Sequence, residues 1–160
     1  MIWKTKKLCE ICDIQSGLWK GKKEPFTETY VLRNTNFTSS GTFNYSDVAV
    51  LQVETKQLKN RLVLPNDIIL EKSGGGETTP VGRVCLYTSE LDKPVSCSNF
   101  TARLRVLDDK EITPLFLHRF LYFLYKSKKT EPMQRYSTGI RNLQISQYKD
   151  IDVPLPPLEE

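Results

Sequence analysis

The sequence predicts an α+β domain: a mixed, twisted β-sheet with long polar loops, with helices from the C-terminal third packed on it. Three observations predict this class. Short runs of β-favouring residues fill the first two-thirds of the chain and alternate with polar, glycine-containing segments. One strong helical pattern follows, at residues 113–129. The length of 160 residues favours a single domain with one core.

The expected strands are short and bounded by turn-forming residues. They cover residues 29–32, 48–53, 68–70, 82–87, 94–97, 101–106 and 151–153. Leu8, Ile11 and Cys12 have the spacing of one helical turn, whereas residues 58–64 are ambiguous. Pro65-Asn66-Asp67 predicts a turn, and loops are expected at 17–26, 33–46 and 71–80.

The helix in the C-terminal third has a clear start. Thr113 is a good N-cap residue, and Pro114 suits the first helical position. Apolar residues then recur in two adjacent stripes, so a wide face of the helix should be buried: Phe116, Phe120 and Phe123 in one, Leu117, Leu121 and Leu124 in the other. A second short helix is expected at 130–136, capped by Thr130, and a turn at 146–149.

The charge balance is mildly basic. The chain has 23 Lys and Arg against 19 Asp and Glu, a net charge of +4, which agrees with a polyanionic partner without requiring one. The N-terminus MIWKTKKLCEICDI has no long apolar run, and no segment reaches the roughly 20 apolar residues that a membrane span needs. We therefore expect a soluble, cytoplasmic protein without a membrane partner.

The cysteines are expected to be buried, reduced thiols. Cys9 and Cys12 form a C-x-x-C pair, which is also typical of redox sites or of half a zinc site. A zinc site needs two more ligands, but Cys85 and Cys97 are poorly spaced for this and His118 lies within the helical pattern. A redox motif should follow a strand, and none is expected before Cys9. The sequence predicts no metal site.

Signatures of catalysis are absent from the sequence. There is no G-x-x-x-x-G-K-[ST] phosphate loop and no G-x-S-x-G nucleophile motif. Pro156-Pro157 is flanked by leucines and cannot act as the Asn/Asp-Pro-Pro-aromatic motif of adenine methyltransferases. Glu71 and Lys72 are adjacent, so on a strand they would point to opposite faces and could not share a nuclease metal with Asp67. We expect a non-catalytic chain that holds no cofactor.

Two polar segments in the first third have the chemistry of DNA contacts. The first holds Lys20, Lys22 and Lys23 beside Trp19, and its lysines could neutralise phosphates. The second holds Arg33, Asn34 and Asn36; arginine reads guanine and asparagine reads adenine through paired hydrogen bonds. The alternatives are a solvated surface loop for the first segment and a turn closed by its own Asn side chains for the second.

Two more polar segments follow. The glycines of the third segment would let the backbone approach a ligand closely. The Glu and Thr side chains of the same segment could contact base edges. The segment consists of Lys72, Ser73, Gly74, Gly75, Gly76, Glu77, Thr78 and Thr79. The fourth gathers small polar and basic residues that could fix register on the phosphate backbone: Arg135, Ser137, Thr138, Arg141 and Asn142. The alternatives are a flexible hairpin for the third segment and a helix end closed by Gly139 for the fourth.

The end of the chain carries a more specific pattern. A Gly-x-x-x-Leu element, Gly139 to Leu143, precedes a run that ends in Pro-Leu-Pro-Pro-Leu-Glu and comprises Val153, Pro154, Leu155, Pro156, Leu158 and Glu159. This closing signature resembles that of a target recognition domain from the specificity (S) subunit of type I restriction-modification systems. The segments Asn66-Asp67-Ile68-Ile69 and Gly82-Arg83-Val84 also suit that family.

The resemblance implies an organisation and a set of partners. Residues 1–153 would be the recognition domain, and 154–160 the start of a truncated spacer helix or linker. The domain would read one half of a split sequence in double-stranded DNA and work with a second recognition domain, in the same subunit or in a homodimer. Modification subunits would use S-adenosylmethionine to methylate adenine, and restriction subunits would use ATP and Mg²⁺. Two alternatives are a recognition domain of a fused restriction-methyltransferase and a protein-interaction module without a DNA role.

Overall fold

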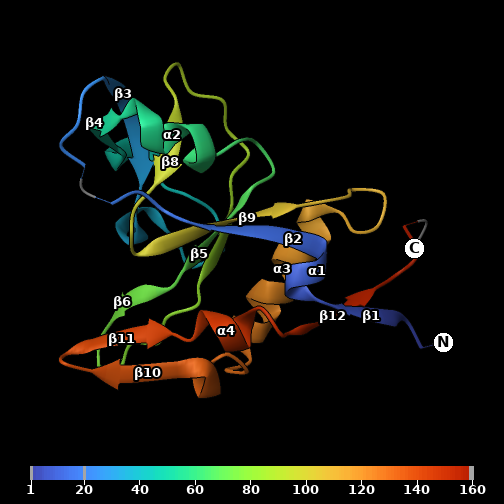
Figure 1. The fold of residues 1–160 in the computed structure, drawn as a ribbon. Coiled ribbons are helices and arrows are strands. Elements are labelled where there is room, and N and C mark those ends of the chain that lie inside the picture. The colour runs from blue at the N-terminus through green and yellow to red at the C-terminus, as the bar shows by residue number, and fades with distance from the viewer. Residues whose placement is uncertain (1, 20, 159–160) are drawn as a thin grey trace.

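The fold combines short strands with one long helix (Figure 1). The structure is a computed structural model, and it describes residues 2–19 and 21–158. Its helices are α1 (Leu8–Ile11), α2 (Thr55–Arg61), α3 (Pro114–Lys126) and α4 (Ile145–Tyr148). Its strands are β1 (Lys4–Lys7), β2 (Cys12–Ser16), β3 (Phe26–Leu32), β4 (Ala49–Glu54), β5 (Ile68–Glu71), β6 (Ser73–Gly75), β7 (Val84–Leu86), β8 (Val95–Cys97), β9 (Thr101–Val106), β10 (Gln134–Ser137), β11 (Ile140–Leu143) and β12 (Asp152–Leu155). None of the described helices has the length and apolar character that a membrane crossing requires.

The strands are divided among small sheets, so the α+β class is confirmed without one continuous sheet. Within the described residues, the sheets have the strand orders β2-β9-β5-β7, β4-β3-β8, β10-β11-β6 and β1-β12. Only β3 and β8 pair in parallel among these ladders. The central ladder ends at Glu71 because the next two amides, of Lys72 and Ser73, both donate to the Phe100 carbonyl. The chain bends there and β6 joins another sheet.

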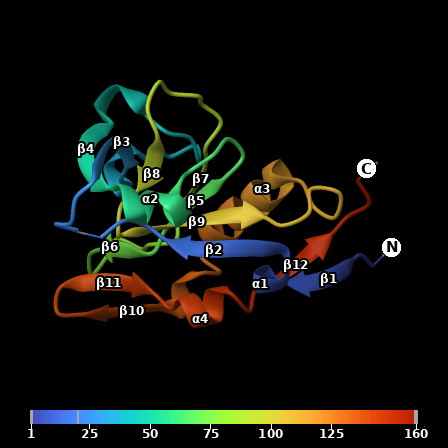
Figure 2. The ribbon, with the colours of Figure 1, turned by 45° about the horizontal axis from the view of Figure 1, so that its top comes forward.

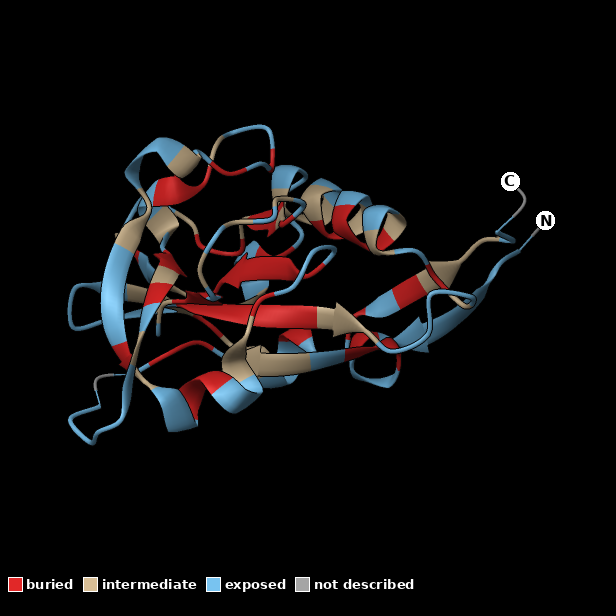
Figure 3. Ribbon diagram, turned by 90° about the horizontal axis from the view of Figure 1, so that it is seen from above, coloured by how far each residue is buried: buried red, intermediate tan, exposed pale blue. Residues whose placement is uncertain are grey.

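Strand β5 of the central sheet is buried on both faces, and Figure 3 shows buried strands inside the molecule. Ile68 and Leu70 of β5 pack with Leu117 and Leu121 of α3, while Ile69 points the other way into a second cluster. That cluster holds Leu32, Phe37, Cys85 and Tyr87, among others. A strand buried on both faces is apolar at every position, which explains why Ile68-Ile69-Leu70 does not alternate with polar residues.

The start of α3 is confirmed, but the predicted burial of its phenylalanines is wrong in part. The Thr113 hydroxyl accepts a hydrogen bond from the Phe116 amide at 3.2 Å, and Pro114 is the first helical residue. The buried stripe is Leu117, His118 and Leu121. Phe123 is 56% exposed. The face of α3 that contacts the sheet is narrower than the two apolar stripes together, so part of the phenylalanine stripe stays in solvent.

Several local predictions are corrected by pairing between distant segments. Residues 130–136 form a 3-10 turn (Glu131–Met133) and then β10, and the expected loop 71–80 contains β6. The polar stretch 134–143 is a β-hairpin whose turn residues, Thr138 and Gly139, have positive φ angles of 51° and 81°. A turn whose two central residues both have positive φ has a backbone twist that matches the right-handed twist of the flanking strands. A strand, β1, also precedes Cys9.

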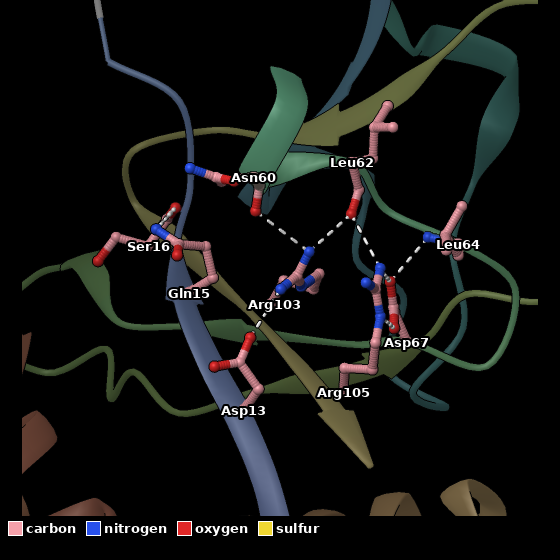
Figure 4. A network of polar contacts seen from close by, with 9 residues as sticks. All are labelled: Asp13, Gln15, Ser16, Asn60, Leu62, Leu64, Asp67, Arg103 and Arg105. Atoms are coloured by element: carbon pink, nitrogen blue, oxygen red, sulfur yellow. Dashed lines mark hydrogen bonds and ion pairs between the residues drawn. The ribbon is translucent and has the colours of Figure 1, made fainter. Parts of the chain in front are cut away.

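Two arginines of β9 connect the central sheet to the segment around α2 (Figure 4). Arg103 is 6% exposed and donates to Asp13 at 2.8 Å and to the carbonyls of Asn60 and Leu62. Arg105 binds both carboxylate oxygens of Asp67, at 2.8 and 2.7 Å, and the hydrogen bond to Asp67 raises the pKa of Arg105. Asp67 also accepts from the Leu64 amide at 2.7 Å, so one buried carboxylate closes the turn before β5.

Replacing Asp67 by Asn should destabilise the fold by about 2–4 kcal/mol, because the partly exposed Arg105 loses a paired charge and one of the two buried acceptor oxygens is replaced by an NH2 group that faces other donors. The measurement is the free energy of unfolding by urea. Asp109→Asn, at an exposed position, is the matched control and should change it by about 0.5 kcal/mol or less. Equal effects of the two substitutions would mean that the Asp67 network contributes little.

Candidate nucleic-acid interface

The polar segments singled out in the sequence gather at one end of the molecule. In Figures 1 and 2, the tip of the β10–β11 hairpin and the segment between β2 and β3 lie at the same end, opposite the two termini. Strand β6 lies between them and beside β11. Segments that are separated along the chain are thus brought to the same side of the molecule.

The third and fourth segments are joined by strand pairing. β6 pairs antiparallel with β11, and Ser73 Oγ donates to Asn142 Oδ1 at 2.5 Å. The Leu143 amide donates to the Lys72 carbonyl at 2.8 Å. A Cβ atom on Gly75 would collide with the Thr79 carbonyl, so only glycine lets the chain turn back so tightly after β6.

An ion pair between the buried Glu71 and the partly exposed Arg83 connects the second segment to this sheet. Glu71 is 4% exposed and receives two hydrogen bonds from Arg83, at 3.1 and 2.6 Å. The Asn34 side-chain amide donates to Glu71 Oε2 at 3.1 Å and to the Ser73 carbonyl at 2.8 Å. Arg83 in turn donates to the Asn34 carbonyl and lies over the Phe37 ring. The position of Asn34 is therefore fixed relative to β6.

The first segment is held by its backbone. Leu18 forms a bridge with Ser98, and the Gln57 side chain exchanges two hydrogen bonds with the Trp19 backbone, at 3.2 and 3.0 Å. The Lys23 amide donates to Glu54 at 2.7 Å. Trp19 and Arg33 both line a groove of about 450 Å³, together with Val31, Leu51 and other residues of the paired strands β3 and β4. The first and second segments therefore border the same groove.

Lys72 is a cation without an acidic partner among the described residues. Its ammonium donates to Ser16 Oγ at 3.1 Å, and burial lowers the pKa of Lys72 below its usual value. The folded chain therefore pays a desolvation cost to keep this charge half-buried between β2 and β6. A phosphate group at this position would compensate the charge.

The cysteines give no support to a redox or metal site. Burial raises the pKa of Cys12 and Cys85 to about 12 and that of Cys97 to about 11, so these thiols stay protonated near neutral pH. Cys9 is exposed, contrary to the expectation that all four are buried. Within residues 2–19 and 21–158, no group of three or more His, Cys, Asp or Glu side chains is placed to hold a metal ion.

Comparison with known families decides the class of this chain. A family model described as "Type I restriction modification DNA specificity domain" matches residues 2–160. The chain belongs to this family. Its members are DNA specificity domains, so the class of function expected from the closing signature is confirmed.

Solved structures show that this specificity domain shares its fold with known S subunits. The crystal structure of the type I restriction-modification S subunit from M. genitalium superposes with a TM-score of 0.60 at 19% identity, covering 98% of this chain and 35% of that one. The HsdS subunit from Thermoanaerobacter tengcongensis gives 0.61 at 16% identity, covering 98% and 34%. The chain thus spans about a third of the length of these subunits. No curated protein matches.

The specificity domain presents most of the predicted site residues to solvent. Those classed as exposed are Lys22, Lys23, Arg33, Gly74, Glu77, Thr78, Thr79, Arg135, Ser137 and Thr138. Half-buried ones are Asn34, Lys72, Ser73, Gly76, Arg141 and Asn142. Lys20 lies outside the described residues, so its predicted role stays a prediction.

Three predicted site residues have structural roles instead. Asn36 is 1% exposed and its side chain binds the Asp47 carbonyl at 3.0 Å and the Arg33 amide at 2.9 Å, which is the alternative considered for this turn. Arg141 donates to the carbonyls of Gly76 and Glu77 and so holds the loop after β6. Gly75 is buried. We therefore leave Asn36 and Gly75 out of the DNA-contacting surface and treat Arg141 as a support of it.

The sequence reasoning missed the turn between β8 and β9. Its residues Asn99 and Phe100 are exposed and lie among the four segments: Asn99 lines the groove beside Trp19, and the Phe100 carbonyl accepts from Lys72 and Ser73. The available signal was the polar dipeptide Ser98-Asn99 between two predicted strands, which is typical of a turn.

Replacing Lys72 by Met should weaken binding to all DNA sequences while leaving the fold as stable as before, or more stable by up to about 1 kcal/mol, because a desolvated charge is removed. The salt dependence of log K should become shallower by about one unit for one lost phosphate contact. Affinity is measured by fluorescence anisotropy and stability by urea unfolding.

Lys110→Met is the matched control for this charge change, since Lys110 is exposed in the loop between β9 and α3, and Figure 1 shows that loop at the end of the molecule near the termini. It should leave affinity and salt slope close to those of the unmodified chain. If Lys110→Met weakened binding as much as Lys72→Met does, the effect would be one of net charge and not of a site at Lys72.

Proposed function

We propose that this specificity domain reads one half of a bipartite DNA sequence and carries out no chemistry itself. The observation that carries the proposal is the convergence of four polar segments, separated by up to about 120 residues, on one end of the fold. Exposed or half-buried cations at that end would contact phosphates: Lys22, Lys23, Arg33, Lys72 and Arg135. Side chains of the turns would lie in the major groove.

The reaction partners are part of the same proposal. Modification subunits would bind S-adenosylmethionine and methylate adenine. They would first extrude the adenine, because its target atom cannot be reached while the base is stacked inside the duplex. Restriction subunits would use ATP and Mg²⁺. The assembly would act in the cytoplasm, with a second recognition domain, in the same subunit or from a homodimer, reading the other half-site.

The arrangement of the ends supports this organisation. β12 extends to Leu155 and pairs with β1, so both ends of the described chain lie together, away from the polar segments. Pro154 and Leu155 belong to β12 and not to the expected spacer, so a spacer helix would begin after Leu155, leave from that side and keep the reading surface free. The family match gives no support to the two alternatives, a fused restriction-methyltransferase and a protein-interaction module.

Binding to duplex DNA at two or more salt concentrations tests the proposal. If the five cations each neutralise one phosphate, log K should fall with log salt with a slope of about −4.5. The measurement is fluorescence anisotropy with a labelled duplex of random sequence and then with selected sequences. No binding at low salt, or binding that does not respond to salt, would contradict a DNA role.

A further inference from the structure

The turn that connects β8 to β9 is anchored on every side although its tip is exposed. Thr101 closes it by donating from its amide and its hydroxyl to the Ser98 carbonyl, at 3.0 and 2.7 Å. The Ser98 amide donates to the Leu32 carbonyl at 2.9 Å, and the Phe100 carbonyl accepts from the amides of Lys72 and Ser73 at 3.0 and 3.2 Å. The backbone that carries Asn99 and Phe100 is therefore rigid.

The first three polar segments approach this turn. A Cβ atom on Gly17 would collide with the Ser98 carbonyl, so glycine is needed where the first segment passes against the turn. Arg33 and Asn99 line the same groove. A Cβ atom on Gly74 would lie 3.1 Å from the Asn34 amide nitrogen and 3.9 Å from the Phe100 ring. The turn thus lies at the centre of the candidate interface.

The side chains of the two tip residues are exposed and available to contact DNA bases. Phe100 is 45% exposed and belongs to none of the hydrophobic clusters formed by the described residues. Asn99 is exposed, and its side chain has no hydrogen-bond partner in the part of the chain that the structure describes. An asparagine amide can pair with N6 and N7 of adenine, and a phenylalanine ring can pack on the methyl group of thymine.

We infer that Asn99 and Phe100 are specificity-determining residues that read A·T base pairs in the major groove. The Phe100 ring contacts a thymine C5-methyl group, and the Asn99 amide pairs with adenine. The inference rests on the proposed DNA function and adds to it the kind of base that the centre of the interface recognises. Lys72 and Arg33, which both lie near the turn, would bind the flanking phosphates and leave the uncharged tip facing the base edges.

The test begins with selection of duplexes from a random-sequence library by the unmodified chain. In the selected duplex each thymine is then replaced by deoxyuridine, which lacks only the C5-methyl group, and each adenine by 7-deazaadenine, which lacks the N7 acceptor. Affinities are compared for the unmodified chain, Phe100→Ala, Phe100→Leu, Asn99→Ala and the control Phe123→Ala on α3, another exposed phenylalanine.

One deoxyuridine replacement should weaken binding by the unmodified chain about fourfold, as expected for one methyl group leaving an apolar contact. The same replacement should have no effect on Phe100→Ala, and the Phe100→Leu and Phe123→Ala variants should keep it. Asn99→Ala should lose about tenfold in affinity for a duplex with adenine at one position and lose its sensitivity to 7-deazaadenine there. This thermodynamic cycle isolates the two contacts from general effects on folding.

Two outcomes would overturn the inference while leaving the DNA function intact: deoxyuridine effects that persist in Phe100→Ala, or equal losses for all sequences in both tip variants. A change in self-association without a change in base preference would assign the turn to a protein contact instead, and would also overturn it. If the unmodified chain selects no duplex and binds none at low salt, the proposed function itself fails. Should Phe100→Ala not fold, the Asn99→Ala and Phe100→Leu results decide.

Discussion

The ion pair between the buried Glu71 and the partly exposed Arg83 is the interaction on which the candidate interface depends. A carboxylate that is 4% exposed must be matched by donors, and Glu71 takes two from Arg83 and one from Asn34. The hydrogen bond to Glu71 raises the pKa of Arg83. Glu71 is also the last residue of β5 and lies two residues before β6, so the pair is placed where the chain passes from the central ladder to β6. The second and third polar segments are therefore positioned by one charge.

The rest of the interface consists of turns on a rigid scaffold, and these turns carry charged and apolar groups that the fold itself does not need. The β9 arginines and the doubly buried β5 hold the layers together, and the turns project from these layers at one end. At that end the fold keeps features that cost stability or contribute little to it: the desolvated Lys72, the glycines beside it, and the exposed ring of Phe100. Such features are expected where a surface is shaped for a ligand.

Features of the fold that depend on local signals could be predicted from the sequence. The α3 N-terminus follows from Thr113 and Pro114, β5 from an apolar run behind a Pro-Asn-Asp turn, and the family from the closing signature. The sequence was insufficient where distant segments pair: β6 is Ser-Gly-Gly and β10 is Gln-Arg-Tyr-Ser, and these sequences form strands only against β11. For the same reason Asn36 and Arg141 could not be distinguished from exposed reading residues, since their partners are carbonyl groups brought near by the fold.

Amide hydrogen exchange with and without duplex DNA tests most directly whether the segments act as one surface. DNA should slow exchange together in residues 17–19, 72–79, 98–101 and 135–142, with no change in β1, β12 or the loop at 107–113. The paired ends of the chain thus serve as an internal reference. Protection confined to β1 and β12, or scattered over both ends of the molecule, would contradict the account.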